Sequence, residues 1–185
     1  MFWADLSKMG FIEDTFSTAS SNTGAVVSGA SIDAYFPQAK LGRSNYIYVW
    51  SGGPLARGTG TFNGDGENYF AISPLSSLNV SYTGNTSSSP GLSVSEAFQI
   101  DQKVDDGLPQ SGRVLALYVN NSLSNPYWAY WAGAASANNG PTTAATSGSS
   151  TTCYVNGNTA GATQRYSVGQ NKGMGVNCAL SFQFQ

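Results

Sequence analysis

The sequence predicts an α+β domain with an antiparallel β-sheet, in which helices and strands are separated by long polar loops. Composition is the first observation: 77 of the 185 residues are Ser, Thr, Asn or Gly, which favours turns and strands over exposed helices. Alternating apolar and polar residues in several short segments are the second. A strong helix-start signal in the middle of the chain is the third. No repeat or linker divides the chain, so we expect one domain over residues 1–185.

The N-terminal residues predict a short amphipathic helix over residues 2–11. Phe2, Leu6 and Met9 fall on one helical stripe. Gly10 is placed to stop this helix, because glycine readily adopts the left-handed conformation that ends helices.

Two strands are predicted in the first half of the chain, after a Ser-, Thr- and Gly-rich loop at residues 15–31. Residues 45–50 place three aromatic side chains on one face of a strand and two branched apolar side chains on the other. The Gly-Gly-Pro sequence at residues 52–54 ends that strand. A second strand at residues 68–72 follows the polar turn at residues 63–66.

The central helix begins at a capping box, in which Ser93 and Glu96 satisfy reciprocal backbone amides. Gly107 and Pro109 end the helix. Its predicted buried stripe has the spacing of three and four residues that marks one helix face. The stripe consists of Val94, Ala97, Phe98, Asp101 and Val104.

Three further strands are predicted in the second half of the chain. Residues 114–119 form a nearly continuous apolar run, which is typical of a central strand. Residues 127–131 are a second strand, and residues 132–152 are a low-complexity loop without periodicity. Residues 178–184 alternate apolar and polar side chains, which predicts a half-buried closing strand.

The charged and catalytic residue types exclude several classes of function. Charged residues make up only 10% of the chain, and its eight Lys and Arg leave a net charge of −2, which argues against a nucleic-acid partner. The sequence contains no His, so Ser-His-Asp and Cys-His catalysis and the usual zinc sites are absent. No run of apolar residues approaches the length of a membrane span. We therefore expect no enzyme, no nucleic-acid partner and no membrane contact for this stretch of chain.

The charges are divided unevenly along the sequence. All ten acidic residues lie at or before Asp106, whereas residues 107–185 contain three basic residues and no acid. Ends of opposite charge suit head-to-tail self-association. Chance in a surface with few charges is the alternative explanation.

The two cysteines, Cys153 and Cys178, lie 25 residues apart. Neither has a second Cys or a His at metal-binding spacing, and a polar surface with a single pair favours a disulfide in an oxidising compartment. Closing a loop of this length stabilises the fold by about 3 kcal/mol. Two free buried thiols are the alternative.

The densest acidic cluster follows the central helix. Asp101 and Asp105 are four residues apart and share a helix face, and Asp106 is adjacent. Paired carboxylates serve acid–base catalysis or bind a hard cation, so these three residues are candidate ligands of a structural Ca²⁺ ion. Calcium needs six or more oxygens, and no nucleophile or base accompanies the cluster. The simpler interpretation is that Asp105 and Asp106 end the helix by bonding to the backbone.

An aromatic cluster near the predicted strand at residues 127–131 is a candidate sugar-binding platform. Trp128, Tyr130 and Trp131 are its members, and surface glycans would be the partners. The alternative is that these side chains form core contacts or cross-strand pairs.

Four segments, in the same order along the chain, resemble a group of bacterial prepilin-like proteins. The N-terminal segment at residues 2–12 is similar to the stretch after the long N-terminal helix of that group. The others are Pro-Gln-Ala-Lys-Leu-Gly at residues 37–42, the segment containing Ile-Asp-Gln-Lys-Val-Asp-Asp-Gly-Leu-Pro-Gln-Ser-Gly within residues 96–112, and the closing strand at residues 177–184. The chain thus resembles the globular headgroup of a type IV pilin or pseudopilin.

This resemblance implies a non-catalytic structural subunit of a type IV pilus or a type II secretion pseudopilus. It implies a pilin-like domain in which an antiparallel sheet lies on a helix and Cys178 pairs with an upstream Cys to give a disulfide-closed C-terminal region. Subunits of this kind assemble with each other through an apolar N-terminal helix, which we expect to precede this chain. The resemblance places the protein on the surface or in the periplasm of a Gram-negative bacterium. The alternative is a β-rich adhesin or a carbohydrate-binding module.

Overall fold

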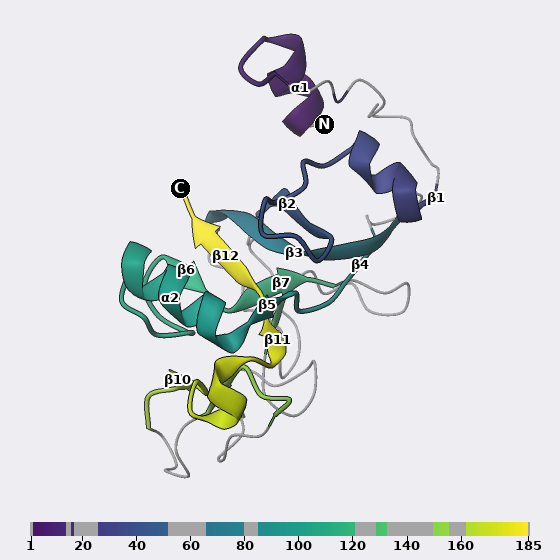
Figure 1. Ribbon diagram of the computed structural model, residues 1–185. Helices are drawn as coiled ribbons and strands as arrows, with labels where there is room; N and C mark the ends of the chain where they lie inside the picture. The colour runs from purple at the N-terminus through teal and green to yellow at the C-terminus, as the bar shows by residue number, and fades with distance from the viewer. Residues whose placement is uncertain are drawn as a thin grey trace.

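The computed structural model describes residues 2–13, 16, 26–51, 66–79, 85–120, 129–132, 150–155 and 162–184. Figure 1 shows α1 at one end of the molecule, the main sheet in the middle and β10 at the opposite end. The helices are α1 (Phe2–Lys8), η1 (Gly29–Ala34), α2 (Val94–Val104) and η2 (Gln170–Gly173). The strands are β1 (Val26–Ser28), β2 (Asn45–Ser51), β3 (Asn68–Asn79), β4 (Asn85–Ser88), β5 (Leu92–Ser93), β6 (Val114–Leu115), β7 (Leu117–Val119), β8 (Ala129–Trp131), β9 (Tyr154–Val155), β10 (Arg165–Tyr166), β11 (Val176–Cys178) and β12 (Leu180–Gln183).

Helix α1 ends at a glycine, as predicted, but it is shorter than expected. Gly10 has φ +71°, and its N–H donates to the carbonyl of Ser7 across 3.0 Å. The N–H of Phe11 donates to the carbonyl of Leu6, also across 3.0 Å. These two bonds form the closing pattern that glycine permits after a helix, so the regular helix stops at Lys8.

The long strand β3 organises a six-stranded sheet in which every pairing is antiparallel. Its first half pairs with β2 and β12, and its second half pairs with β1 and β4. β3 therefore extends seven residues beyond the predicted end at Ile72. Pro74 lies where the pairing of β3 with β2 ends and its pairing with β4 begins. Proline has no N–H to donate to a neighbouring strand, and at this position the strand changes from one partner to the next. Helices combined with antiparallel sheets confirm the predicted α+β class.

The aromatic face predicted for residues 45–50 is confirmed and faces the core. Tyr46 and Tyr48 are buried and pack with Ile32 of η1. Trp50 stacks on Tyr69 with ring centroids 4.5 Å apart. The alternation along the strand places these aromatic side chains on one face, where Ile32 and Tyr69 pack against them.

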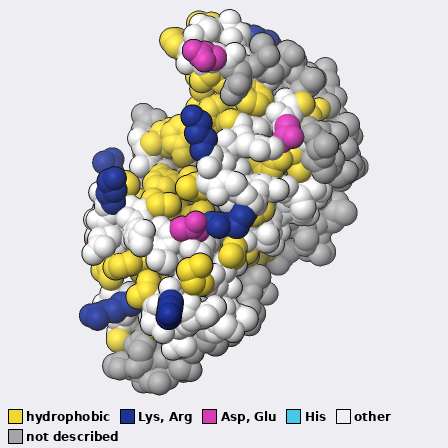
Figure 2. All heavy atoms as spheres, in the orientation of Figure 1, with side chains coloured by type: hydrophobic (Ala, Val, Ile, Leu, Met, Phe, Trp, Pro, Cys, Tyr) yellow, Lys and Arg dark blue, Asp and Glu magenta, His cyan; other side chains and the backbone are white. Residues whose placement is uncertain are grey.

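The opposite face of the sheet carries α1 through an aromatic cluster. Phe70 of β3 has its ring centroid 5.9 Å from that of Phe2 and 6.4 Å from that of Trp3. Phe184, which follows β12, lies 4.4 Å from Phe70. Figure 2 shows apolar side chains over the face that extends from α1 toward the middle of the molecule. The first turn of α1 is thus joined to the sheet by ring contacts.

The capping box of α2 is formed as predicted. Glu96 donates its backbone N–H to the Ser93 hydroxyl across 3.2 Å, and the Ser93 N–H donates to the Glu96 carboxylate across 2.8 Å. Four members of the predicted stripe pack inward or against the core, but Val104 is 62% exposed. The prediction that Val104 is buried was wrong, and Asp105, the residue after the helix, has a non-helical backbone.

The apolar run at residues 114–119 is buried throughout, but it is not a central strand. It divides into β6, at the edge of the six-stranded sheet, and β7, which pairs with β8 in a separate sheet. The division falls at Ala116, whose N–H donates to the carbonyl of Pro109 across 2.7 Å. Between β3 and β6 lies β12 instead.

The closing strand is confirmed at β12, but it is more deeply buried than predicted. Leu180 and Ser181 point to opposite faces and are both 0% exposed. The Ser181 hydroxyl donates to the carbonyl of Leu117 across 2.9 Å and accepts from the Trp50 indole N–H across 3.2 Å. A polar side chain is tolerated there because its hydrogen bonds are satisfied.

The predicted loop at residues 15–31 contains β1 and the start of η1. The turns predicted at residues 52–54 and 63–65, the start of the strand predicted at 127–131, and residues 133–149 lie outside the described residues. Within the described part of the chain, no helix has the length and apolar character needed to cross a membrane.

Candidate functional site

Three aspartates at the end of α2 form the acidic turn, defined here as Asp101, Asp105 and Asp106. One carboxylate oxygen from each lies within 4.8 Å of the others. The structure therefore brings together the three residues that the sequence singled out. Their hydrogen-bond partners show what the cluster does.

Asp101 is a fully buried carboxylate at the centre of a polar network. It is 0% exposed, and it accepts hydrogen bonds from the Tyr166 hydroxyl across 2.8 Å and from the Gly107 N–H across 3.1 Å. Burial raises the pKa of Asp101 to about 6, against the lowering effect of these two bonds. The neighbouring charges of Asp106 and Asp105 raise this pKa further.

Asp105 ties the end of the helix to the start of β6. Its carboxylate accepts the N–H of Arg113 and, across 3.0 Å, the N–H of Val114. The chain approaches so closely that a Cβ at Gly112 would lie 2.0 Å from an Asp105 oxygen. Gly112 also has φ +72°, so glycine is required there for two reasons.

Asp106 stabilises the turn between the end of α2 and the start of β6. Its carboxylate accepts the Leu108 N–H across 2.8 Å and the Ser111 hydroxyl across 2.6 Å. Each carboxylate of the acidic turn therefore serves as an acceptor for nearby chain donors. This arrangement supports the helix-ending interpretation. Calcium binding remains a prediction, for which the three carboxylates supply only part of the six or more oxygens required.

The predicted disulfide between Cys153 and Cys178 is present. The sulfur atoms are 2.01 Å apart and both cysteines are fully buried. The bond joins the segment before β9 to β11, and the N–H of Ser167 donates to the carbonyl of Cys153 across 2.9 Å. A structural disulfide is compatible with an oxidising compartment, outside the cell or in the periplasm.

The acidic turn and the disulfide-closed region are parts of one network. Tyr166 belongs to β10, which pairs with β9, the strand that begins directly after Cys153. The hydroxyl of Tyr166 donates a hydrogen bond to Asp101 of α2 and so connects the disulfide-closed region to the acidic turn. Sequence reasoning did not identify Tyr166 or Gly107 as partners of Asp101. No local pattern could identify Tyr166, because 65 residues separate it from Asp101.

Two of the three residues of the candidate sugar platform, Tyr130 and Trp131, are buried. Tyr130 and Trp131 are 7% and 4% exposed, and both pack in the buried apolar cluster that includes Leu117 of the neighbouring strand β7. A sugar stacks on an accessible ring face, which neither residue offers. For these two residues the burial favours the alternative of core packing, and the sugar platform stays a prediction. The third member, Trp128, lies outside the described residues.

No family model, curated protein or solved structure matches this chain.

Proposed function

We propose that this chain is the non-catalytic globular head of a bacterial filament subunit of the type IV pilin or pseudopilin class. The observation that carries the proposal is the placement of α1. Its first turn packs on one face of an antiparallel sheet through Phe2, Trp3 and Phe70, while the disulfide-closed region occupies the opposite end (Figure 1). A helix that enters the domain in this way is suited to continue an upstream assembly helix.

The segments that carry the family resemblance occupy structurally important positions, which supports the proposal. The segment at residues 96–112 contains most of α2 and the whole acidic turn, up to the start of β6. Residues 177–184 include Cys178 and the buried strand β12. Residues 37–42 lead into β2, with the Ala39 N–H donating to the carbonyl of Asn45 across 2.8 Å.

The chemistry of the chain favours a structural role over a catalytic one. The sequence has no His, and the carboxylates that lie closest together are acceptors for the turn that they end. A surface rich in Ser, Thr and Asn together with a buried disulfide suits a part exposed in the periplasm or outside a Gram-negative cell. The burial of Tyr130 and Trp131 gives no support to the carbohydrate-binding alternative.

The coding sequence upstream of Met1 tests this proposal. We expect it to encode an apolar helix of about 20 or more residues. A Gly-Phe-Thr-Leu-Ile-Glu type processing site should precede that helix. An upstream region that encodes an unrelated domain, or that lacks an apolar helix, would contradict the proposal.

A further inference from the structure

The end of the molecule that carries α1 exposes apolar side chains beside acidic ones. We call it the acidic end and define it by Asp5, Met9, Phe11 and Glu13. Met9 is 70% exposed and Phe11 is 72% exposed, the two largest values among the strongly exposed apolar residues. Both acids are exposed as well. Large apolar side chains left in water at one end of a molecule are a feature of contact surfaces.

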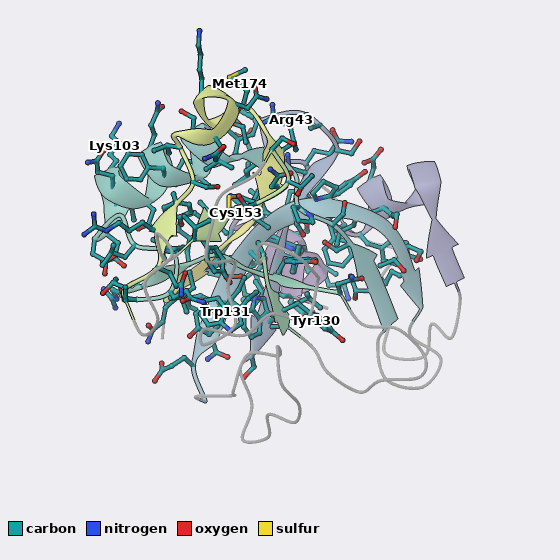
Figure 3. All side chains as sticks on the ribbon, turned by 90° about the horizontal axis from the view of Figure 1, so that it is seen from below. Arg43, Lys103, Tyr130, Trp131, Cys153 and Met174 are labelled. Atoms are coloured by element: carbon teal, nitrogen blue, oxygen red, sulfur yellow. A yellow bond between two sulfur atoms is a disulfide. The ribbon has the colours of Figure 1, made fainter. Side chains whose placement is uncertain are left out.

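The opposite end exposes apolar side chains beside basic ones. We call it the basic end and define it by Arg165, Lys172, Met174 and Val176, which come from β10, η2 and the chain that leads into β11. Met174 is 65% exposed and Val176 is 46% exposed. Both basic residues are also exposed. Figure 3 shows Met174 on a turn that projects from the body of the domain.

The two ends have opposite charge. On α1 and the residues that follow it, the exposed charges are Asp5, Lys8 and Glu13, which leave one net negative charge. At the other end Arg165 and Lys172 carry two positive charges, and no acid occurs anywhere after Asp106. In Figure 2, an acidic and a basic side chain are both visible at the top, whereas the charged side chains visible at the lower end are Lys and Arg. Within the described part of the chain, the recorded ion pair joins Arg43 and Glu96, so the charges of both ends remain available to another molecule.

We infer that the acidic end of one molecule docks on the basic end of a second copy of this chain. Apolar contact between the exposed Met, Phe and Val side chains would supply affinity, and the opposite charges would set the orientation. Because the two surfaces differ, the contact is head-to-tail and repeats into an open chain of subunits. The biological setting of this contact rests on the proposed filament function. Its test uses this chain alone, so it can fail independently of the search for an upstream helix.

The contact should be weak and sensitive to salt. Few side chains at each end are strongly exposed, so we expect a dissociation constant between about 1 µM and 1 mM. Salt screens exposed charges, so raising the ionic strength should weaken association. In a filament, many weak contacts act together with the other contacts between subunits.

Sedimentation velocity with two complementary variants tests the inference. The first variant, Asp5→Asn with Glu13→Gln and Phe11→Ser, blocks the acidic end. The second, Arg165→Gln with Lys172→Gln and Met174→Ser, blocks the basic end. The matched control, Lys40→Glu with Leu41→Ser, changes one exposed charge and one exposed apolar side chain in the loop before β2.

We expect the wild type and the control to form concentration-dependent oligomers at low salt, and each blocked variant alone to remain monomeric. An equimolar mixture of the two variants should form dimers and nothing larger, because each retains the end that the other needs. A monomeric wild type at 1 mM, oligomers formed by either blocked variant alone, or a mixture without dimers would each overturn the inference. If a triple variant fails to fold, the single changes Phe11→Ser and Met174→Ser replace it, since both side chains lie mostly in water.

Discussion

The hydroxyl of Tyr166 donates a hydrogen bond to the buried carboxylate of Asp101 across 2.8 Å, although 65 residues separate them in sequence. Asp101 lies in the last turn of α2, and Tyr166 lies in the region closed by the disulfide. The pair therefore connects the helix, the acidic turn and the C-terminal region. It stabilises their arrangement only while both partners are present, because a buried charged group without a partner is costly.

Tyr166→Phe should lower the free energy of unfolding by about 1 to 3 kcal/mol at pH 7, because it leaves the buried Asp101 carboxylate with one donor fewer. Urea denaturation measures this change. Tyr35→Phe is the matched control, since Tyr35 is half-buried and has no recorded hydrogen bond from its hydroxyl among the described residues; we expect a change below about 0.5 kcal/mol. Equal effects of the two changes would contradict the role of the Tyr166–Asp101 pair.

Asp101 should make the fold more stable as the pH falls. Its pKa is about 6 in the folded protein, above the ordinary value, so the folded state binds a proton more tightly than the unfolded state does. Stability from this group is therefore gained as the pH falls from 7 toward 4, by about 2 to 3 kcal/mol. Glu96 and Asp33 act in the opposite direction, because hydrogen bonds lower their pKa values.

The contribution of Asp101 can be isolated with Asp101→Asn, which cannot titrate. Thermal or urea unfolding of both proteins at several pH values gives the difference in their unfolding free energies. We expect this difference to move in favour of the wild type as the pH falls. A difference that stays constant between pH 7 and pH 4 would show that Asp101 titrates normally.

Gly112→Ala should destabilise the fold by about 2 kcal/mol or more. Its φ of +72° is unfavourable for alanine, and the added methyl would lie 2.0 Å from an Asp105 oxygen. Gly66→Ala is the control, because Gly66 also has a positive φ of +81° but nothing lies within 4 Å of the added atom. The extra loss for Gly112→Ala, measured by thermal unfolding, reports the contact with Asp105. Identical losses would contradict that contact.

The acidic turn should hold together without calcium. Each of its three carboxylates accepts hydrogen bonds from nearby groups, so we expect the melting temperature to be unchanged by excess EDTA or by millimolar CaCl₂. Differential scanning fluorimetry measures both. A calcium-dependent rise in melting temperature that disappears in Asp105→Asn would establish a structural ion instead.

The sequence predicted best those features that depend on neighbouring residues. The Ser93–Glu96 capping box and the stop at Gly10 involve partners within a few positions of each other, so their chemistry is visible in the sequence. The pairing of Cys153 with Cys178 followed because the chain has no other cysteine.

The errors arose where distant segments decide the outcome. Residues 114–119 have the composition of a central strand, but Ala116 bonds to Pro109 and β12 lies between β3 and β6. From the sequence, Tyr130 and Trp131 could belong either to a sugar-binding platform or to core contacts, and only the structure shows that both side chains are buried. Periodicity gives the faces of an element, whereas its neighbours determine which face is covered.

Assembly of the full-length chain into filaments tests the central claim most directly. The chain with its native upstream segment would be expressed in a Gram-negative host that assembles type IV pili or pseudopili. Surface filaments would then be sheared off and probed with an antibody against this domain. We expect the domain in the sheared filament fraction, and we expect its loss from that fraction when the upstream segment is deleted. A domain that stays unassembled while the host's filaments are recovered would contradict its role as a filament subunit.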